Sequence, residues 1–172
     1  MSYRTAPNFK RIILSHNKKI LHAPAPPLPC NCRKKEDCPM VDGQCRAENI
    51  ISRATITPRE PTEKTETYVG MTKSVFKERY GNHKKSFTHK RYSTETSLSI
   101  HAWKLKEKQI DYDIKWQVID RATPFSPVSG ICHLYTLEKY HILFSPESST
   151  LNKNDEIYKP CVHRRFMLLD KT

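Results

Sequence analysis

The sequence lacks long apolar runs, and it has few acidic side chains for its number of basic ones. No apolar stretch reaches the roughly 18–20 residues of a membrane-spanning helix, so we expect no membrane partner. Polar residues follow Met1 where the apolar part of a secretory signal would lie, and we therefore expect no secretion. Lys and Arg number 30 against 18 Asp and Glu, a formal net charge of +12. This excess favours polyanionic partners, above all nucleic acid.

The 172 residues suffice for one compact domain with a short appendage, or for two very small units. Residues 1–29 form a basic, proline-rich arm, with a short helix predicted over Asn8–Leu14 and an extended spacer in APAPPLP. Residues 30–48 hold a cluster of cysteines, and residues 49–172 carry alternating strand and helix patterns. We therefore divide the chain into an arm, a Cys-rich segment and an α/β domain.

Four cysteines, Cys30, Cys32, Cys38 and Cys45, lie within sixteen residues of each other. Thiolates at this density suit a tetrahedral zinc site, and the lack of a secretory signal favours metal binding over disulfides. The spacing is not one of the common zinc-ribbon spacings, so two disulfides and free thiols stay as alternatives. We predict a zinc knuckle in this segment.

The fold predicted for residues 49–172 is a small α/β domain, with a three-stranded, mainly antiparallel sheet flanked by helices. β-branched and alternating residues predict strands at Asn49–Ile56, Glu66–Met71 and Ile114–Ile119. Apolar residues at helical spacing predict helices at Ser74–Phe87, Leu98–Lys106 and Ile131–Leu143. We expect the chain after Pro146 to be mostly irregular.

The first of these helices carries Arg79 and His83 four residues apart, hence on one face. Tyr68 lies near the end of the preceding strand. A permanent cation, a titratable imidazole and a phenol together suit binding of a phosphodiester and transfer of a proton beside it. The alternatives are a surface arginine and a histidine and tyrosine that serve in packing.

Basic residues are concentrated around the same helix. The segment 73–91 holds seven Lys and Arg residues against Glu78 alone, a net charge of +6. A focused basic patch of this kind favours binding of the DNA backbone, although a solvated helix face is the alternative. The residues predicted to contact DNA besides Arg79 are Lys73, Lys77, Lys84, Lys85, Lys90 and Arg91.

The ordered motifs resemble the GIY-YIG nuclease family, with Tyr68-Val69-Gly70 matching the second half of that name. The similarity is closest to the C-terminal endonuclease region of Penelope-like retroelements, which carry stretches similar to PNFKRIILSHNKKIL, CNCRKKEDCP, YVGMTKSVFKERYGNHKKSF, LSIHAWKLK and LEKYHIL. The resemblance implies a metal-dependent DNA endonuclease that nicks DNA by hydrolysis. It also implies a retroelement reverse transcriptase as a partner in trans, and a location in the nucleus, otherwise in the cytoplasm.

The resemblance assigns a role to each candidate residue. Glu138 would hold Mg²⁺ or Mn²⁺, and Arg79 would stabilise the charge on the phosphate. Tyr68 would hydrogen-bond the phosphate or the attacking water, His83 would accept a proton, and Asn152 would support the site by hydrogen bonding. The alternative for Glu138 is a surface charge paired with Lys139 or another cation.

One position departs from the family pattern. Alignment of Ile50-Ile51-Ser52 with the first motif puts a serine where the family has a tyrosine that helps to activate water. Serine is shorter and cannot place a phenolic oxygen at the same point. Either His83 serves as the base, or the chain is a catalytically impaired DNA-binding module that keeps the nuclease fold.

A second zinc site is a further hypothesis, because the resemblance implies a paired Cys/His site within the domain. Cys132, Cys161 and His163 supply three ligands, and His133, His141 or water would be the fourth. A buried free thiol at Cys132 is the alternative.

Overall fold

The computed structural model describes residues 29–34, 36–40, 42–125, 127, 131–145 and 149–163. The helix predicted over Asn8–Leu14 and the extended arm up to residue 28 lie outside the described residues.

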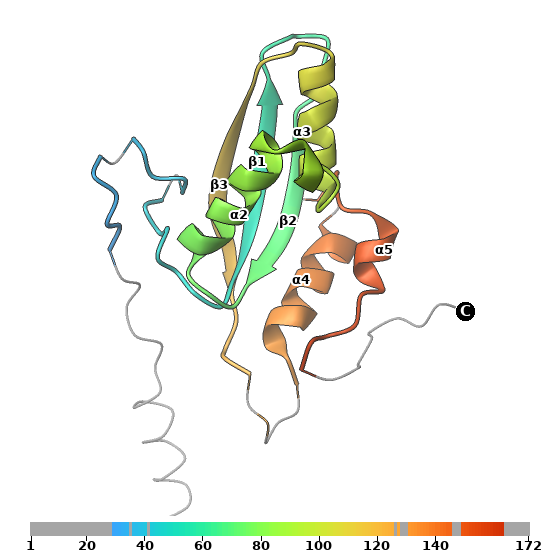
Figure 1. The fold of residues 1–172 in the computed structure, drawn as a ribbon. Coiled ribbons are helices and arrows are strands. Elements are labelled where there is room, and N and C mark those ends of the chain that lie inside the picture. The colour runs from blue at the N-terminus through green and yellow to red at the C-terminus, as the bar shows by residue number, and fades with distance from the viewer. Residues whose placement is uncertain are drawn as a thin grey trace, which may run out of the picture.

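A three-stranded antiparallel sheet forms the centre of the molecule (Figure 1), as predicted. Its strands are β1 (Ile50–Pro58), β2 (Glu66–Thr72) and β3 (Tyr112–Arg121), in the order β2-β1-β3. The third strand is longer than predicted at both ends, because its polar terminal residues also pair with β1.

Helices flank this sheet, and they are α2 (Phe76–Thr88), α3 (Ser97–Glu107) and α4 (His133–Phe144). A short 3₁₀ turn, η1 (Lys90–Tyr92), follows α2. A four-residue helix, α5 (Asn154–Ile157), interrupts the chain that we expected to be irregular. The predicted α/β class is thus confirmed.

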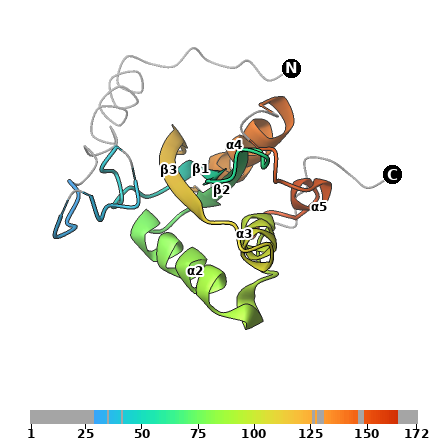
Figure 2. The ribbon, with the colours of Figure 1, turned by 90° about the horizontal axis from the view of Figure 1, so that it is seen from above.

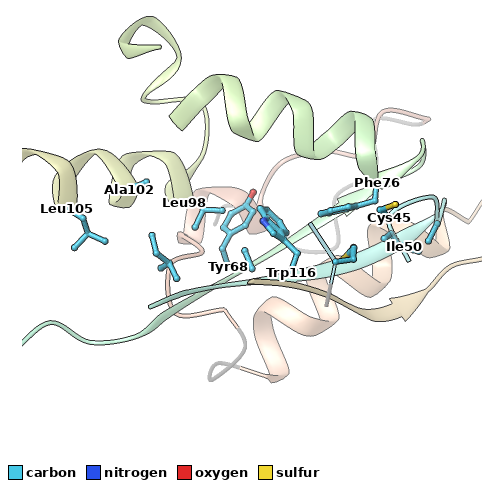
Figure 3. Packing of buried hydrophobic residues seen from close by; sticks show 12 residues of the cluster. Cys45, Ile50, Tyr68, Phe76, Leu98, Ala102, Leu105 and Trp116 are labelled. Atoms are coloured by element: carbon cyan, nitrogen blue, oxygen red, sulfur yellow. The ribbon is translucent and has the colours of Figure 1, made fainter. Parts of the chain in front are cut away.

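The helices cover both faces of the sheet (Figure 2). Because side chains alternate along a strand, the central strand β1 sends Ile50 and Ala54 to one face and Ile51 to the other. The first face packs against α2 and α3 around Trp116 (Figure 3), and the second packs against α4. The core of the first face also contains Tyr68.

The Cys-rich segment shares this first core. Met40 and Cys45 are buried in it, and Met40 forms a β-bridge with Trp116. The backbone carbonyl of Cys45 accepts a hydrogen bond from the amide of Lys77 at 2.8 Å, and that of Ala47 accepts from Phe76 at 2.9 Å. These carbonyls satisfy amides that a helix leaves free at its start, so the segment holds the N-terminus of α2 in place.

Strand β2 lies at an edge of the sheet, so half of its backbone groups have no partner strand. The chain after α4 satisfies those of Thr67 and Val69. The Asn152 side chain accepts from the Val69 amide at 2.8 Å and donates to the Val69 carbonyl at 2.9 Å, as a paired strand would. Thr67 is bonded through its amide to the Thr150 hydroxyl and through its carbonyl to the Leu151 amide.

Replacement of Asn152 by alanine is expected to lower the free energy of unfolding by about 1–3 kcal/mol, because it leaves the Val69 amide and carbonyl without a partner. Urea denaturation followed by circular dichroism measures this change. Lys153→Ala, which alters an exposed neighbouring side chain, is the control and should change stability by less than about 0.5 kcal/mol. Equal losses in the two variants would contradict the role given to Asn152.

Candidate functional site

A cleft of about 540 Å³ opens beside the edge strand β2, where helices from the two faces of the sheet come together. It brings three of the predicted catalytic residues to one place: Tyr68 from β2, Arg79 from α2 and Glu138 from α4. A neighbouring hollow of about 320 Å³ shares Arg79 with it. The guanidinium of Arg79 is therefore the cation common to both hollows.

Tyr68 is buried, with its ring close to Gly70, where an added Cβ would lie only 3.1 Å from the ring. Burial raises the pKa of the Tyr68 phenol, and the carboxylate of Glu156 raises it further. Arg79 opposes these effects through its charge and a hydrogen bond to the phenol. Tyr68 thus stays a neutral hydrogen-bond donor at neutral pH.

His83 does not line the cleft but packs behind Tyr68. Its side chain is 3% exposed, and its ring centroid lies 4.9 Å from that of Trp116 and 6.1 Å from that of Tyr68. Burial, with a smaller effect of the Arg79 charge, lowers the pKa of His83 to about 3. A base this weak holds no proton at neutral pH, so the environment favours the packing alternative for His83.

Ser52 lies opposite Gly70 on β2 and does not line the cleft either. It is 3% exposed, and its hydroxyl donates to the Gly70 carbonyl at 3.2 Å. Its oxygen is thus engaged with the backbone and enclosed by the core. Neither Ser52 nor His83 presents a proton acceptor to the cleft.

The Glu138 side chain is largely enclosed, and it pairs with Lys139, the partner that the alternative for this residue named. Its Oε1 accepts from the Met71 amide at 3.2 Å, and its Oε2 accepts from the Lys139 ammonium at 3.0 Å. The Glu138 side chain is 13% exposed and that of Lys139 only 3%. The bond to Met71 continues the row of contacts along the open edge of β2, and it fixes the carboxylate at the cleft.

The divalent ion that the resemblance implies does not fit this arrangement well. Mg²⁺ and Mn²⁺ bind carboxylate oxygens, and both oxygens of Glu138 already have partners, one of them a cation. Among the described residues, the side chains close enough to form a group of three or more metal ligands are cysteines and one histidine.

Two residues of the cleft, Lys139 and Glu156, were not among the predicted site residues. Lys139 lies four positions after Tyr135 and three before Ile142, both buried, so helical spacing places it on the inner face of α4. That signal is present in the sequence. Glu156 lies in α5, and its carboxylate accepts from Ser97 at 3.1 Å and from the side chain of Asn152. No sequence pattern indicates this position.

The four clustered cysteines converge, with all four sulfur atoms within 4.8 Å of one another. The Sγ of Cys45 lies 3.6 Å from that of Cys30 and 3.9 Å from that of Cys32. A zinc ion with Zn–S bonds of about 2.3 Å in a tetrahedron requires S–S distances of about 3.8 Å. The group could therefore hold a metal ion such as Zn²⁺.

The backbone favours the thiolate form at one of the four cysteines, Cys30. The amide of Cys32 donates to the Cys30 sulfur at 3.3 Å, and this bond above all lowers the pKa of Cys30 to about 7. Burial instead raises the pKa of Cys45 to about 12. Metal ligation stabilises the thiolate form. All six cysteines are free thiols in this structure.

A second group consists of Cys132, Cys161 and His163, whose ligand atoms also lie within 4.8 Å of one another. The Sγ of Cys161 lies 3.6 Å from Nδ1 of His163. His133 and His141, which we considered as a fourth ligand, form hydrogen bonds with other side chains and do not join the group. These three residues could hold a metal ion, with water as the remaining candidate ligand.

The side chains predicted to contact DNA are exposed on and around α2. Lys77 donates to the Asn31 side chain at 3.1 Å, which ties this helix to the Cys-rich segment, and Arg91 stacks over the ring of Tyr92. All six of these predicted residues are exposed, namely Lys73, Lys77, Lys84, Lys85, Lys90 and Arg91.

Comparison of the chain with protein-family models, with curated proteins and with solved structures finds no match. Within the described ranges, no helix is both long enough and apolar enough to cross a membrane.

Replacement of His83 by phenylalanine is expected to flatten the dependence of stability on pH. The unfolded chain takes up a proton at His83 near pH 6.5, whereas the folded chain does so only near pH 3. The stability from the buried neutral ring is fully present above pH 6.5 and is lost as the pH falls toward 3, by up to about 1.4 kcal/mol per pH unit.

Urea denaturation at several pH values between 4 and 7 measures this slope. His89→Gln, which replaces an exposed histidine, is the control and should keep the slope of the unaltered chain. Parallel curves for His83→Phe and the unaltered chain would show that His83 carries no buried neutral ring.

Proposed function

We propose that the chain is a DNA endonuclease of the GIY-YIG kind, which nicks DNA by phosphodiester hydrolysis, and that the cleft at β2 binds the phosphodiester. The observation that supports this most is the meeting of Tyr68, Arg79 and Glu138 in one cleft. They come from three elements that are far apart in the sequence. The resemblance of the sequence motifs extends this proposal. It implies a retroelement origin, a reverse transcriptase that acts in trans and a nuclear location.

Two polar side chains of the cleft, Arg79 and Tyr68, suit a phosphate. Arg79 offers a planar fork of donors that keeps its positive charge, and it would bind the non-bridging phosphate oxygens. Tyr68, held as a neutral phenol, would donate a hydrogen bond to the same group. In the hydrolysis, the oxygen of water forms a bond to phosphorus, the bond from phosphorus to the 3′ oxygen breaks, and the 3′ oxygen takes up the proton that the water gives up.

The exposed lysines and arginine of α2 and η1 would guide the DNA backbone to this cleft. Each phosphate contact releases a counterion, so binding through this surface should weaken steeply as salt increases. The net charge of +12 favours the same partner.

A second candidate is a DNA-binding module without catalysis. It is favoured by the positions of Ser52 and His83, because both are buried away from the cleft and neither can accept a proton there. Loss of one positioned base typically lowers a rate on the order of 10²–10⁴-fold. The two candidates thus share the DNA-binding surface and differ in the rate of nicking.

Nicking of supercoiled plasmid by the full chain tests the proposal. Arg79→Ala is expected to lower the rate about 10²–10³-fold, because it removes the cation that faces the phosphate. Arg59→Ala removes the same charge from an exposed site outside the cleft and is the matched control. Equal rates in these two variants would contradict the role of the cleft.

A pair of variants at Ser52 separates the two candidates in the same assay. Ser52→Tyr and Ser52→Phe impose a similar packing cost on the core, on the order of 1–3 kcal/mol, but only the tyrosine adds a phenolic oxygen. Nicking that appears in Ser52→Tyr alone, in a chain that otherwise binds DNA without cleaving it, supports the binding module. Nicking by the unaltered chain supports the nuclease.

We also propose that Cys30, Cys32, Cys38 and Cys45 bind Zn²⁺ and that this ion has a structural role. The sulfur distances fit a tetrahedral thiolate site, and the segment that carries them supplies the carbonyls at the start of α2. Zinc would therefore stabilise the helix that positions Arg79.

Zinc at one hundred times its Kd is expected to add about 2.7 kcal/mol to the stability of the folded state, or roughly 5–11 °C in Tm. Thermal unfolding with and without added zinc measures this shift. Cys45→Ser should abolish it, whereas Cys132→Ser, which leaves the four-cysteine group intact, should retain most of it. A shift that survives Cys45→Ser would mean that the stabilising ion binds elsewhere.

A further inference from the structure

Lys139 is the least accessible charged side chain of the cleft. Its ammonium donates to Oε2 of Glu138 at 3.0 Å and to the backbone carbonyl of Glu156, and it lies 5.1 Å from the centre of the Tyr135 ring. Its side chain is 3% exposed. A carboxylate, a carbonyl and an aromatic face thus surround a single positive charge.

This ammonium cannot leave its position without a large penalty. Withdrawal of Lys139 would leave the buried carboxylate of Glu138 with only the Met71 amide as a partner, and an unpaired buried charge is strongly unfavourable. The Glu138 carboxylate and the Glu156 carbonyl both direct an oxygen to the position of this ammonium, so the position suits a cation. The chain fills it with one of its own side chains.

We propose that the ammonium of Lys139 is the resident cation of the cleft, in the position beside Glu138 that a divalent metal ion would otherwise take. Lys139 is then a positioning residue that acts through Glu138. The inference rests on the proposed function for the identity of the cleft as a phosphodiester site. It specifies that positively charged side chains, Arg79 above all, and not a divalent metal ion, would bind the phosphate.

The first consequence concerns binding of Mn²⁺, followed by the electron paramagnetic resonance signal of the free ion. Zinc-loaded full chain is the sample, so that the thiolate groups, which prefer zinc, are occupied. The unaltered chain and Glu138→Gln are expected to bind Mn²⁺ equally weakly. A saturable Mn²⁺ site in the unaltered chain that Glu138→Gln removes would overturn the proposal, and this comparison requires no change at Lys139.

The second consequence concerns variants of Lys139. Lys139→Met keeps the length of the side chain and removes its charge, so it is expected to bind one Mn²⁺ at least about tenfold more tightly than the unaltered chain. Addition of Glu138→Gln to that variant should abolish the gain, and Lys139→Arg, which keeps a cation in place, should show none. A folded Lys139→Met chain that gains no Mn²⁺ site would overturn the proposal.

These measurements are independent of cleavage. A chain that fails to nick DNA but shows the expected Mn²⁺ binding would refute the nuclease and retain Lys139 as the resident cation. A chain that nicks DNA and binds Mn²⁺ through Glu138 would support the nuclease and refute Lys139 as the resident cation.

Discussion

The hydrogen-bonding groups along the open edge of β2 organise the C-terminal half of the domain. A strand at a sheet edge leaves alternate amides and carbonyls without a partner, and buried groups of this kind must be satisfied. Here Asn152 and Glu138 supply the partners for Val69 and Met71. The same bonds bring α4 and α5 against the strand, and thereby place Glu138 and Glu156 beside Tyr68.

The wall of this cleft contains charged side chains that are largely enclosed and have polar partners. Lys139 neutralises Glu138, and Arg79 faces Tyr68 from the other side of the strand edge. Because Lys139 is paired with Glu138 inside the wall, Arg79, which lines both hollows, is a cation placed to meet an anion. Lys139 and Glu138 would thus hold the cleft together, whereas Arg79 would contact a phosphate. All three are charged residues that line the same cleft.

The Cys-rich segment acts on the same cleft from a distance. It contributes Met40 and Cys45 to the core of the first face and supplies the carbonyl groups at the start of α2. The segment that carries the four sulfur atoms thus helps to position α2, the helix that carries Arg79. A segment that the sequence separates from the α/β domain is part of the same packed unit in space.

Local patterns in the chain were enough to predict the three strands, the three longer helices and the convergence of four cysteines, because strand alternation, helical spacing and short loops depend on neighbours in sequence. The motifs also indicated Tyr68, Arg79 and Glu138. Burial is different, since it depends on contacts between distant segments. Only the tertiary structure shows that His83 and Ser52 are enclosed in the core and that Glu138 is paired with Lys139. The free energy of a charged or titratable side chain is set by the groups and solvent around it, and these come from all parts of the fold.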